Sequence, residues 1–309
     1  MPVLSIVACR MLEDELVHLL SADGEVRELL LVDGMQALSL SAKLRAQSRP
    51  HLLLGLDKIS QHLLERRCRP AGIFSRSSHR KAAELTIVVS PLRLGLHSDL
   101  ELLKSAVYDN VRRLSAFSDG ILIFYGKCGN ALADLEHDLS DLACQLYFLT
   151  DEQGERIDDC IALALGGNVN YDRTLAEHQD VALFMTPMWA SNWKAMGDET
   201  ASGKRLDLGA MLKGTGMTKV ARIDTGLCFE PGFMELVDGF AREFGLQRIE
   251  LPGGTNVAEG CYERAKSRLG AESPRGMRPG AGISSPKFWR CLAAIQAICR
   301  MTRKKLLGE

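Results

Sequence analysis

The chain of 309 residues has the composition of an ordinary globular protein, with 46% hydrophobic and 25% charged residues and a formal net charge of −1. Its length allows about two domains with buried cores. The near-neutral charge argues against nucleic acid as the main partner. The first residues lack a basic segment before an apolar run, and no apolar run approaches the roughly 18 residues of a membrane span. We therefore expect a cytoplasmic protein without a membrane span.

Short apolar runs alternate with amphipathic segments along the whole chain. The patterns predict strands at residues 3–8, 28–32, 85–89, 121–124, 144–150, 181–185, 218–223 and 246–251. They predict helices at residues 11–20, 100–114, 131–137, 160–165, 233–244 and 288–307, and a further helix that opens after Asn256. Strands that alternate with helices indicate an α/β fold with parallel sheet strands.

Three strand-loop-helix units, near residues 3–20, 119–136 and 219–243, repeat one local plan and could be pseudo-symmetric. They suggest a division into four parts. These are a first unit at 1–118 with an insertion at about 50–84, a second unit at 119–217, a third at 218–270, and a linker with an amphipathic helix at 271–309.

Nine cysteines are scattered along the chain with no CxxC pair, at positions 9, 68, 128, 144, 160, 228, 261, 291 and 299. An odd, scattered set is not typical of a disulfide framework. Most of these residues are expected to be small buried hydrophobes. A subset that shares one position type is the candidate site.

Cys9 and Cys128 hold the same position, directly after a predicted buried strand and before a helix. Gly126 and Gly129 bracket Cys128, so the backbone can turn tightly there and approach a ligand closely. Asn130 is a suitable N-cap for the helix that follows. Ligand sites of open α/β sheets lie at this edge, beyond the carboxyl ends of the strands.

Two further residues sit at the start of predicted helices. Asp158 or Asp159 is suited to cap a short helix whose first turn contains Cys160, and a helix N-terminus stabilises a thiolate. His97 lies at another strand-to-helix junction, either as a ligand or as a structural hydrogen-bonding residue. Trp189 and Trp193, four residues apart, are expected to pack as core.

Cys9, Cys128, Cys160 and His97 together would form a Cys3His set, which suits zinc. The three cysteines alone would suit an iron–sulfur cluster with one iron open to a substrate. The alternative is that the glycines and cysteines only permit tight packing of helices on the sheet. The residues themselves leave these options open.

Several segments together resemble an uncharacterised protein family, catalogued as a domain of unknown function, number 1638. The resemblance covers roughly residues 3–268. It is carried by Ile6–Cys9 with the acidic helix start, Leu96-His97, Tyr125–Asn130, Asp159–Ile161 with Gly166, and Ile223–Gly226. Members often lie beside genes for corrinoid-dependent methyltransferases of methylamines and betaines.

The resemblance implies that Cys9, Cys128 and Cys160 belong to one site, with His97 and Asp159 nearby. The cofactor-binding positions that we expect are Tyr125, Gly126, Gly129, Asp159 and Asp224. Leu100 replaces a proline that is usual in the family, and residues 50–84 and the tail after 270 are additions to its pattern.

The resulting expectation is a protein with a cysteine-ligated iron–sulfur cluster or zinc in one-carbon metabolism. It would be a methyltransferase, or an accessory to a corrinoid system, with a small-molecule substrate and a corrinoid or methyltransferase protein as partner. Two alternatives stand beside it, and whether the chain is an enzyme at all is open. One is a non-enzymatic binding or assembly protein that uses the region of Trp189 and the basic tail, and the other is an iron–sulfur lyase.

Overall fold

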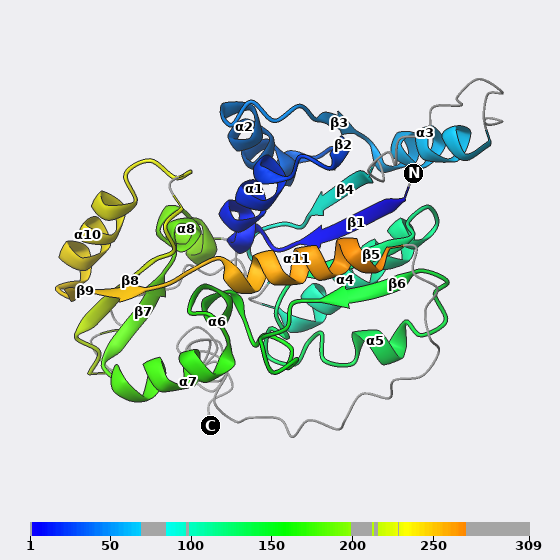
Figure 1. Cartoon of the computed structure of the whole chain (residues 1–309). Coiled ribbons are helices and arrows are strands. Elements are labelled where there is room, and N and C mark those ends of the chain that lie inside the picture. The colour runs from blue at the N-terminus through cyan, green and yellow to red at the C-terminus, as the bar shows by residue number, and fades with distance from the viewer. Residues whose placement is uncertain are drawn as a thin grey trace, which may run out of the picture.

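The computed structural model describes residues 2–68, 85–96, 99–198, 212, 216–227 and 229–269. His97 and the expected linker and helix at residues 271–309 lie outside these ranges. Strands and helices alternate along the described chain, and the strands pair in parallel within two sheets (Figure 1). The predicted α/β class is therefore confirmed. The threefold repetition and the four-part division stay predictions.

The larger sheet has six strands in the order β3-β2-β4-β1-β5-β6. They are β1 (Val3–Ala8), β2 (Val26–Val32), β3 (Leu52–Leu54), β4 (Leu85–Pro91), β5 (Gly120–Phe124) and β6 (Gln145–Phe148). The central strands β1, β4 and β5 are buried along their whole length. Burial on both faces explains why their sequences are continuous apolar runs instead of alternating patterns.

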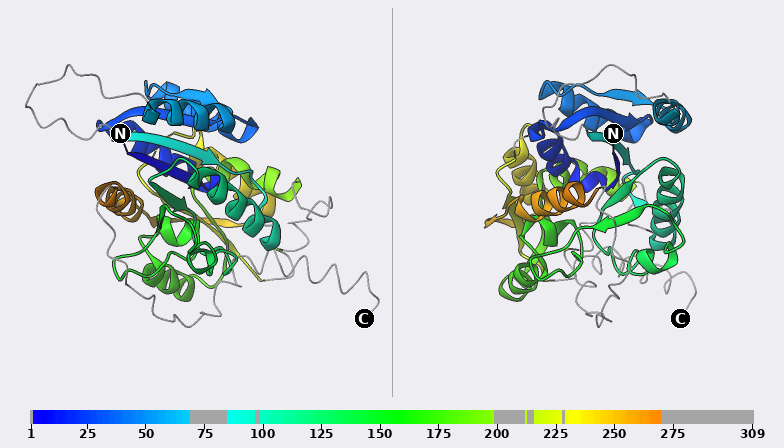
Figure 2. Two further views of the ribbon diagram at one scale, coloured as in Figure 1. Left: turned by 90° about the vertical axis from the view of Figure 1, so that its right-hand side faces the viewer. Right: turned by 45° about the vertical axis from the view of Figure 1, so that its right-hand side comes forward.

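Helices cover both faces of this sheet. They include the 3-10 turns η1 (Arg10–Leu12) and η2 (Met35–Ala37), and the helices α1 (Glu13–Ala22), α2 (Leu38–Ala46), α3 (Leu56–Cys68), α4 (Leu100–Ser115) and α5 (Leu135–Asp138). Helix α4 lies on one face and α11 (Asn256–Arg268) on the other, and both contact β5 (Figure 2). None of the helices in the described ranges combines the length and the apolar character that crossing a bilayer requires.

The smaller sheet has the order β7-β8-β9, with β7 at Val181–Met185, β8 at Lys219–Asp224 and β9 at Gln247–Pro252. Helices α8 (Pro187–Asp198) and α10 (Phe233–Phe244) pack against each other. The Trp193 ring meets the Phe240 ring edge-on, with 4.9 Å between the ring centroids. Trp193 is thus part of a core, as predicted.

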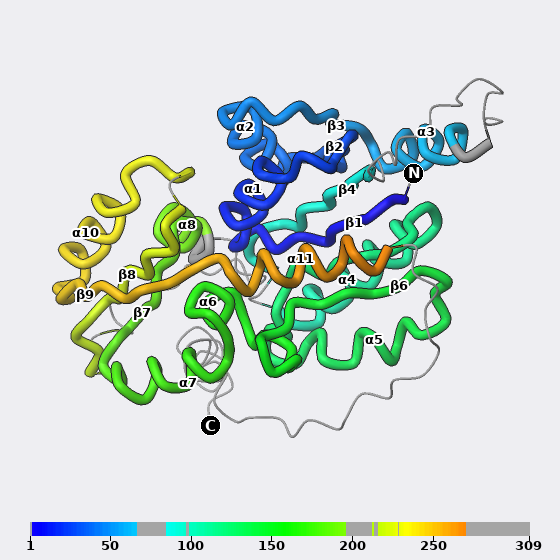
Figure 3. Tube along the Cα trace, in the orientation of Figure 1, coloured from blue at the N-terminus to red at the C-terminus, as the bar shows by residue number. Residues whose placement is uncertain are grey.

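Two stretches of chain join the smaller unit to the larger one. Helices α6 (Cys160–Ala164) and α7 (Asn168–Glu177) lead from the larger sheet to β7, and the segment after β9 leads back into α11 (Figure 3). The two stretches touch, because the N–H of Gly254 donates a hydrogen bond to the Ala164 carbonyl at 2.9 Å. A Cβ atom on Gly253 would lie 2.8 Å from that carbonyl oxygen, so glycine permits the close crossing.

Lys266 fastens α11 to the larger unit. Its side chain is 8% exposed, and its Nζ lies 2.6 Å from Asp23 Oδ2 and 2.9 Å from Glu25 Oε2. The Tyr262 hydroxyl donates to the same Asp23 oxygen at 2.7 Å. The buried Asp23 carboxylate is therefore neutralised by residues of the returning helix.

We predict that Lys266→Met lowers the free energy of unfolding by about 3 kcal/mol, because it leaves a buried carboxylate without its cation. Urea unfolding at pH 7 measures the effect. Lys104→Met is the matched control, since Lys104 is 37% exposed and lies 3.6 Å from Asp138. The control should stay within about 1 kcal/mol of the wild type. Equal losses in both variants would contradict the anchoring role of Lys266.

Candidate functional site

Two of the three predicted thiols lie at the carboxyl ends of strands in the larger sheet. Cys9 directly follows β1, and its N–H donates to the carbonyl of Phe124, the last residue of β5, at 3.1 Å. Tyr125 follows β5 and is buried, and its hydroxyl forms a hydrogen bond with the Cys9 thiol. The pairing of β1 with β5 thus brings the first predicted ligand beside the loop of the second.

The loop that carries Cys128 is fastened to the chain segment before α6. The N–H groups of Lys127 and Cys128 donate to the carbonyls of Ile157 and Asp158 at 2.8 and 2.9 Å. A Cβ atom on Gly126 would lie 2.7 Å from the Asp158 oxygen, so only glycine permits this approach. The close approach that the sequence predicts at Gly126 is therefore an approach to the backbone of Asp158 and Asp159.

The helix expected directly after Asn130 is wrong at its start, because α5 begins only at Leu135. Cys128, Gly129 and Asn130 have φ angles of 47°, 69° and 66°, so the chain continues to turn instead of entering a helix. A left-handed φ costs a cysteine roughly 1 kcal/mol. Strain of this kind is concentrated at functional sites, where the surrounding structure maintains it.

The third thiol is positioned by a capped helix start. Asp159 Oδ1 accepts hydrogen bonds from the N–H groups of Ile161 and Ala162 at 2.8 and 2.9 Å, as predicted. The Tyr171 hydroxyl donates to Asp159 Oδ2 at 3.2 Å. These contacts fix Cys160 in the first turn of α6, next to the segment that holds the Cys128 loop.

Trp189 covers the third thiol from the other unit. Its indole Nε1 donates to Cys160 Sγ at 3.2 Å. Trp189, which was expected to pack as core, belongs to α8, which follows the first strand of the smaller sheet. The thiol site is therefore built from both units.

The three thiols interact electrostatically. Burial raises the pKa of Cys9 to about 12, and it raises the pKa values of Cys128 and Cys160 well above their ordinary value. A thiolate at Cys9 would raise the pKa values of the other two further, and one at Cys128 would raise that of Cys160. The negative charge of Asp159 acts on both in the same direction. The helix start was expected to stabilise a thiolate at Cys160. Burial and the charge of Asp159 outweigh that effect and raise the pKa of Cys160.

Arg156 places a positive charge near Cys128, and no sequence pattern predicted this. Burial raises the pKa of Cys128 most strongly, and Arg156 acts against that rise. The Arg156 Nη1 donates to Ala133 O at 3.0 Å, its guanidinium carbon lies 4.1 Å from the Phe148 ring centroid, and its buried Nη2 has no hydrogen-bond partner. Only the fold brings Arg156 to this loop.

One predicted position stands apart from this group. Asp224 Oδ1 accepts a hydrogen bond from Gly226 N–H at 3.1 Å in the turn after β8, and its side chain is 56% exposed. His97 lies outside the described residues, so its place in the site stays a prediction. The residues that the contacts and charges above connect are Cys9, Tyr125, Gly126, Cys128, Asp159 and Cys160.

The donor chemistry of three converging thiols suits a thiophilic metal. In the part of the chain that the structure describes, no group of three or more His, Cys, Asp or Glu side chains is spaced so that it could hold a metal ion. A metal bound by these thiols therefore requires the sulfur atoms to move closer together.

Residues 91–262, more than half of the chain, match the family described as "Protein of unknown function (DUF1638)". The chain belongs to this family. The match includes Cys128, Cys160 and Asp224, whereas Cys9 precedes it. No curated protein and no solved structure matches the chain.

We predict that Gly126→Ala lowers the free energy of unfolding by about 1–3 kcal/mol, because the new Cβ atom overlaps backbone that cannot yield easily. Gly24→Ala is the control, since no atom lies within 4 Å of the position of its Cβ. The control should stay within about 1 kcal/mol of the wild type. Urea unfolding of both variants at pH 7 tests this, and a neutral Gly126→Ala would refute the tight docking of the loop.

We predict that Asp159→Asn makes Cys128 and Cys160 more reactive toward iodoacetamide at pH 8, by roughly threefold to tenfold. The amide oxygen keeps the helix cap, but the charge that raises both thiol pKa values is lost. Burial raises the pKa of Asp159 to about 6, so the wild type carries this charge only above that pH. The difference should therefore narrow below pH 6. Peptide mass spectrometry gives the rates, the exposed Asp141→Asn is the control, and a pH-independent ratio would contradict the argument.

Proposed function

We propose that Cys9, Cys128 and Cys160 of this DUF1638 protein together bind zinc or an iron–sulfur cluster, and that the loaded site serves methyl transfer in one-carbon metabolism. The observation that carries the proposal is the convergence of three buried thiols from three separate elements, with mutual effects on their pKa values. Ionising these three buried thiols without a nearby cation costs free energy. A bound metal supplies the missing positive charge and favours the thiolate form of its ligands.

The proposed metal would be held by the three cysteines, with His97 as a fourth ligand in the zinc case. When bound, a thiophilic metal supplies Lewis acidity that lowers the pKa of a substrate thiol and so makes it a methyl acceptor. The chain supplies the surroundings. Trp189 and Tyr125 keep water from two of the sulfur atoms through hydrogen bonds, and Arg156 adds a positive charge beside Cys128.

In this proposal the methyl donor is a methylated corrinoid on a partner protein, and the acceptor is a small thiol. The methyl group would pass from cobalt to the thiolate sulfur, and the electron pair of the broken Co–C bond would stay on cobalt. The chain would act either as the methyltransferase or as an accessory to a methyltransferase.

Metal analysis of protein purified without oxygen tests the binding site. We expect stoichiometric zinc or iron in the wild type, and loss of most of the metal in Cys9→Ser, Cys128→Ser and Cys160→Ser. Cys144→Ser is the control and should keep its metal, because Cys144 lies before β6, away from these contacts. Wild-type protein that takes up neither zinc nor an iron–sulfur cluster on reconstitution would refute the proposal.

Methylcobalamin and a small thiol serve as probes for the reaction. Metal-loaded protein should accelerate the loss of the cobalt–methyl absorbance and form one thioether per methyl group consumed. Apo-protein and the three serine variants should give the uncatalysed rate. Metal-loaded protein that binds a corrinoid protein without catalysing the transfer would favour the accessory role, and protein with neither property would exclude methyl transfer.

A further inference from the structure

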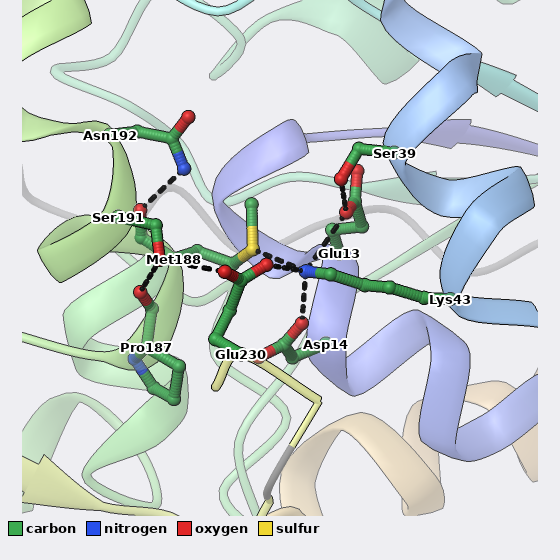
Figure 4. A network of polar contacts seen from close by, with 9 residues as sticks. All are labelled: Glu13, Asp14, Ser39, Lys43, Pro187, Met188, Ser191, Asn192 and Glu230. Carbon is green, nitrogen blue, oxygen red and sulfur yellow. Dashed lines mark hydrogen bonds and ion pairs between the residues drawn. The ribbon is translucent and has the colours of Figure 1, made fainter. Parts of the chain in front are cut away.

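Lys43 of α2 lies at the centre of a buried polar network (Figure 4). Its side chain is 10% exposed, and its Nζ lies 3.0 Å from Glu13 Oε1 and 2.6 Å from Asp14 Oδ1. The same Nζ contacts Glu230 and lies 3.0 Å from the Met188 sulfur. One ammonium group thus has three carboxylates and a thioether around it.

These partners come from both units of the fold. Lys43, Glu13 and Asp14 belong to α2 and α1 on the larger sheet. Met188 is in α8, and Glu230 lies in the connection between β8 and α10, so both belong to the smaller unit. The Lys43 ammonium therefore forms an ionic bridge across the boundary between the units.

The smaller unit holds its side of the bridge in place. The Ser191 hydroxyl, also in α8, donates to Glu230 Oε2 at 2.8 Å (Figure 4). Helix α8 thus reaches Lys43 through Met188 and supports Glu230 through Ser191. The same helix places Trp189 on Cys160, so the element that Lys43 holds is the one that covers the third thiol.

The charge balance makes this bridge sensitive to the loss of Lys43. Glu13 Oε2 and Asp14 Oδ2 are buried without a hydrogen-bond partner, so the lysine is their main compensation. Burial raises the pKa of Asp14, and Lys43 acts against that rise. Without the ammonium, Glu230 would face Glu13 and Asp14 directly. Like charges would then push the smaller unit away from the larger one.

The helix start that carries Glu13 and Asp14 also acts on Cys9 through the charge of Glu15. Glu15 follows Asp14 in the first turn of α1 and is buried. Its charge adds to the rise in the pKa of Cys9 that burial causes. Helix α8 packs against η1, the turn that begins after Cys9. A separation of α8 from this turn would therefore open the site at Cys9 and at Cys160.

We propose that Lys43 is a positioning residue that holds α8 closed over Cys9 and Cys160, so that the Lys43–Glu230 contact sets the accessibility of these two thiols. The inference concerns access and holds whether or not the thiols bind a metal. A failure of metal binding would therefore leave it standing. Conversely, metal binding alone would not establish it.

Alkylation of metal-free protein by iodoacetamide, with the rate followed at each cysteine by peptide mass spectrometry, tests the proposal. Lys43→Met should raise the rates at Cys9 and Cys160 by roughly tenfold or more, because local opening then costs less free energy. Cys261 is the internal reference. Cys261 belongs to α11 and is buried, with its thiol hydrogen-bonded to the backbone of Thr150, away from α8. Its alkylation rate should not change.

A second variant distinguishes the contact between Lys43 and Glu230 from a general effect of Lys43 on folding. Glu230→Gln keeps the contacts of Lys43 with Glu13 and Asp14 and weakens only the contact across the boundary. It should raise the alkylation rates at Cys9 and Cys160 by a smaller factor. Lys194→Met is the surface control, since Lys194 is 72% exposed, and it should react like the wild type. The proposal is overturned by unchanged rates at Cys9 and Cys160 in both bridge variants, or by a parallel rise at Cys261, which would indicate general loosening.

Discussion

The parallel pairing of β1 with β5 is the constraint on which the site depends. Because Ala8 and Phe124 are register partners, the residues that follow them emerge at the same edge of the sheet. Any side chain placed directly after either strand is then a close neighbour of the other loop. The Cys128 loop adds a second constraint, since its backbone is bonded to the segment that leads into α6. Together these two backbone contacts bring three distant parts of the chain to one place.

Burial dominates the chemistry of that place. Thiols and carboxylates at the boundary of the two units have lost their hydration, and for Cys9, Cys128, Cys160, Glu15 and Asp159 the result is a raised pKa. Each ionised member would raise the ionisation cost of its neighbours. The site therefore favours protons or a cation over isolated anions. The ammonium of Lys43 acts against the rise in the pKa of Glu15, and the guanidinium of Arg156 acts against the rise in that of Cys128.

Local patterns predicted those parts of the structure that local forces determine. The cap at Asp159 depends on hydrogen bonds to residues two and three positions ahead, so its residue type was sufficient. The placement of Cys9 and Cys128 at strand ends followed from apolar runs with clear ends. The predicted start of α5 was wrong. Asn130 alone would favour a helix cap, but long-range backbone hydrogen bonds hold the chain in a turn at Cys128. Trp189, Arg156 and Lys43 reach the site only through the tertiary fold, and nothing in their own sequence neighbourhoods indicates this.

The return of the chain from β9 into α11 has a consequence for the order of folding. Helix α11 packs on β5, β6 and α1, so the larger unit is complete only when residues 256–268 are available. The whole smaller sheet lies between β6 and that helix in the sequence. During synthesis the amino-terminal strands therefore emerge long before their last covering helix, with an apolar sheet face exposed in the meantime. The smaller unit must form as an insertion within an unfinished neighbour, and the crossing at Gly254 and Ala164 can close only after both have been made.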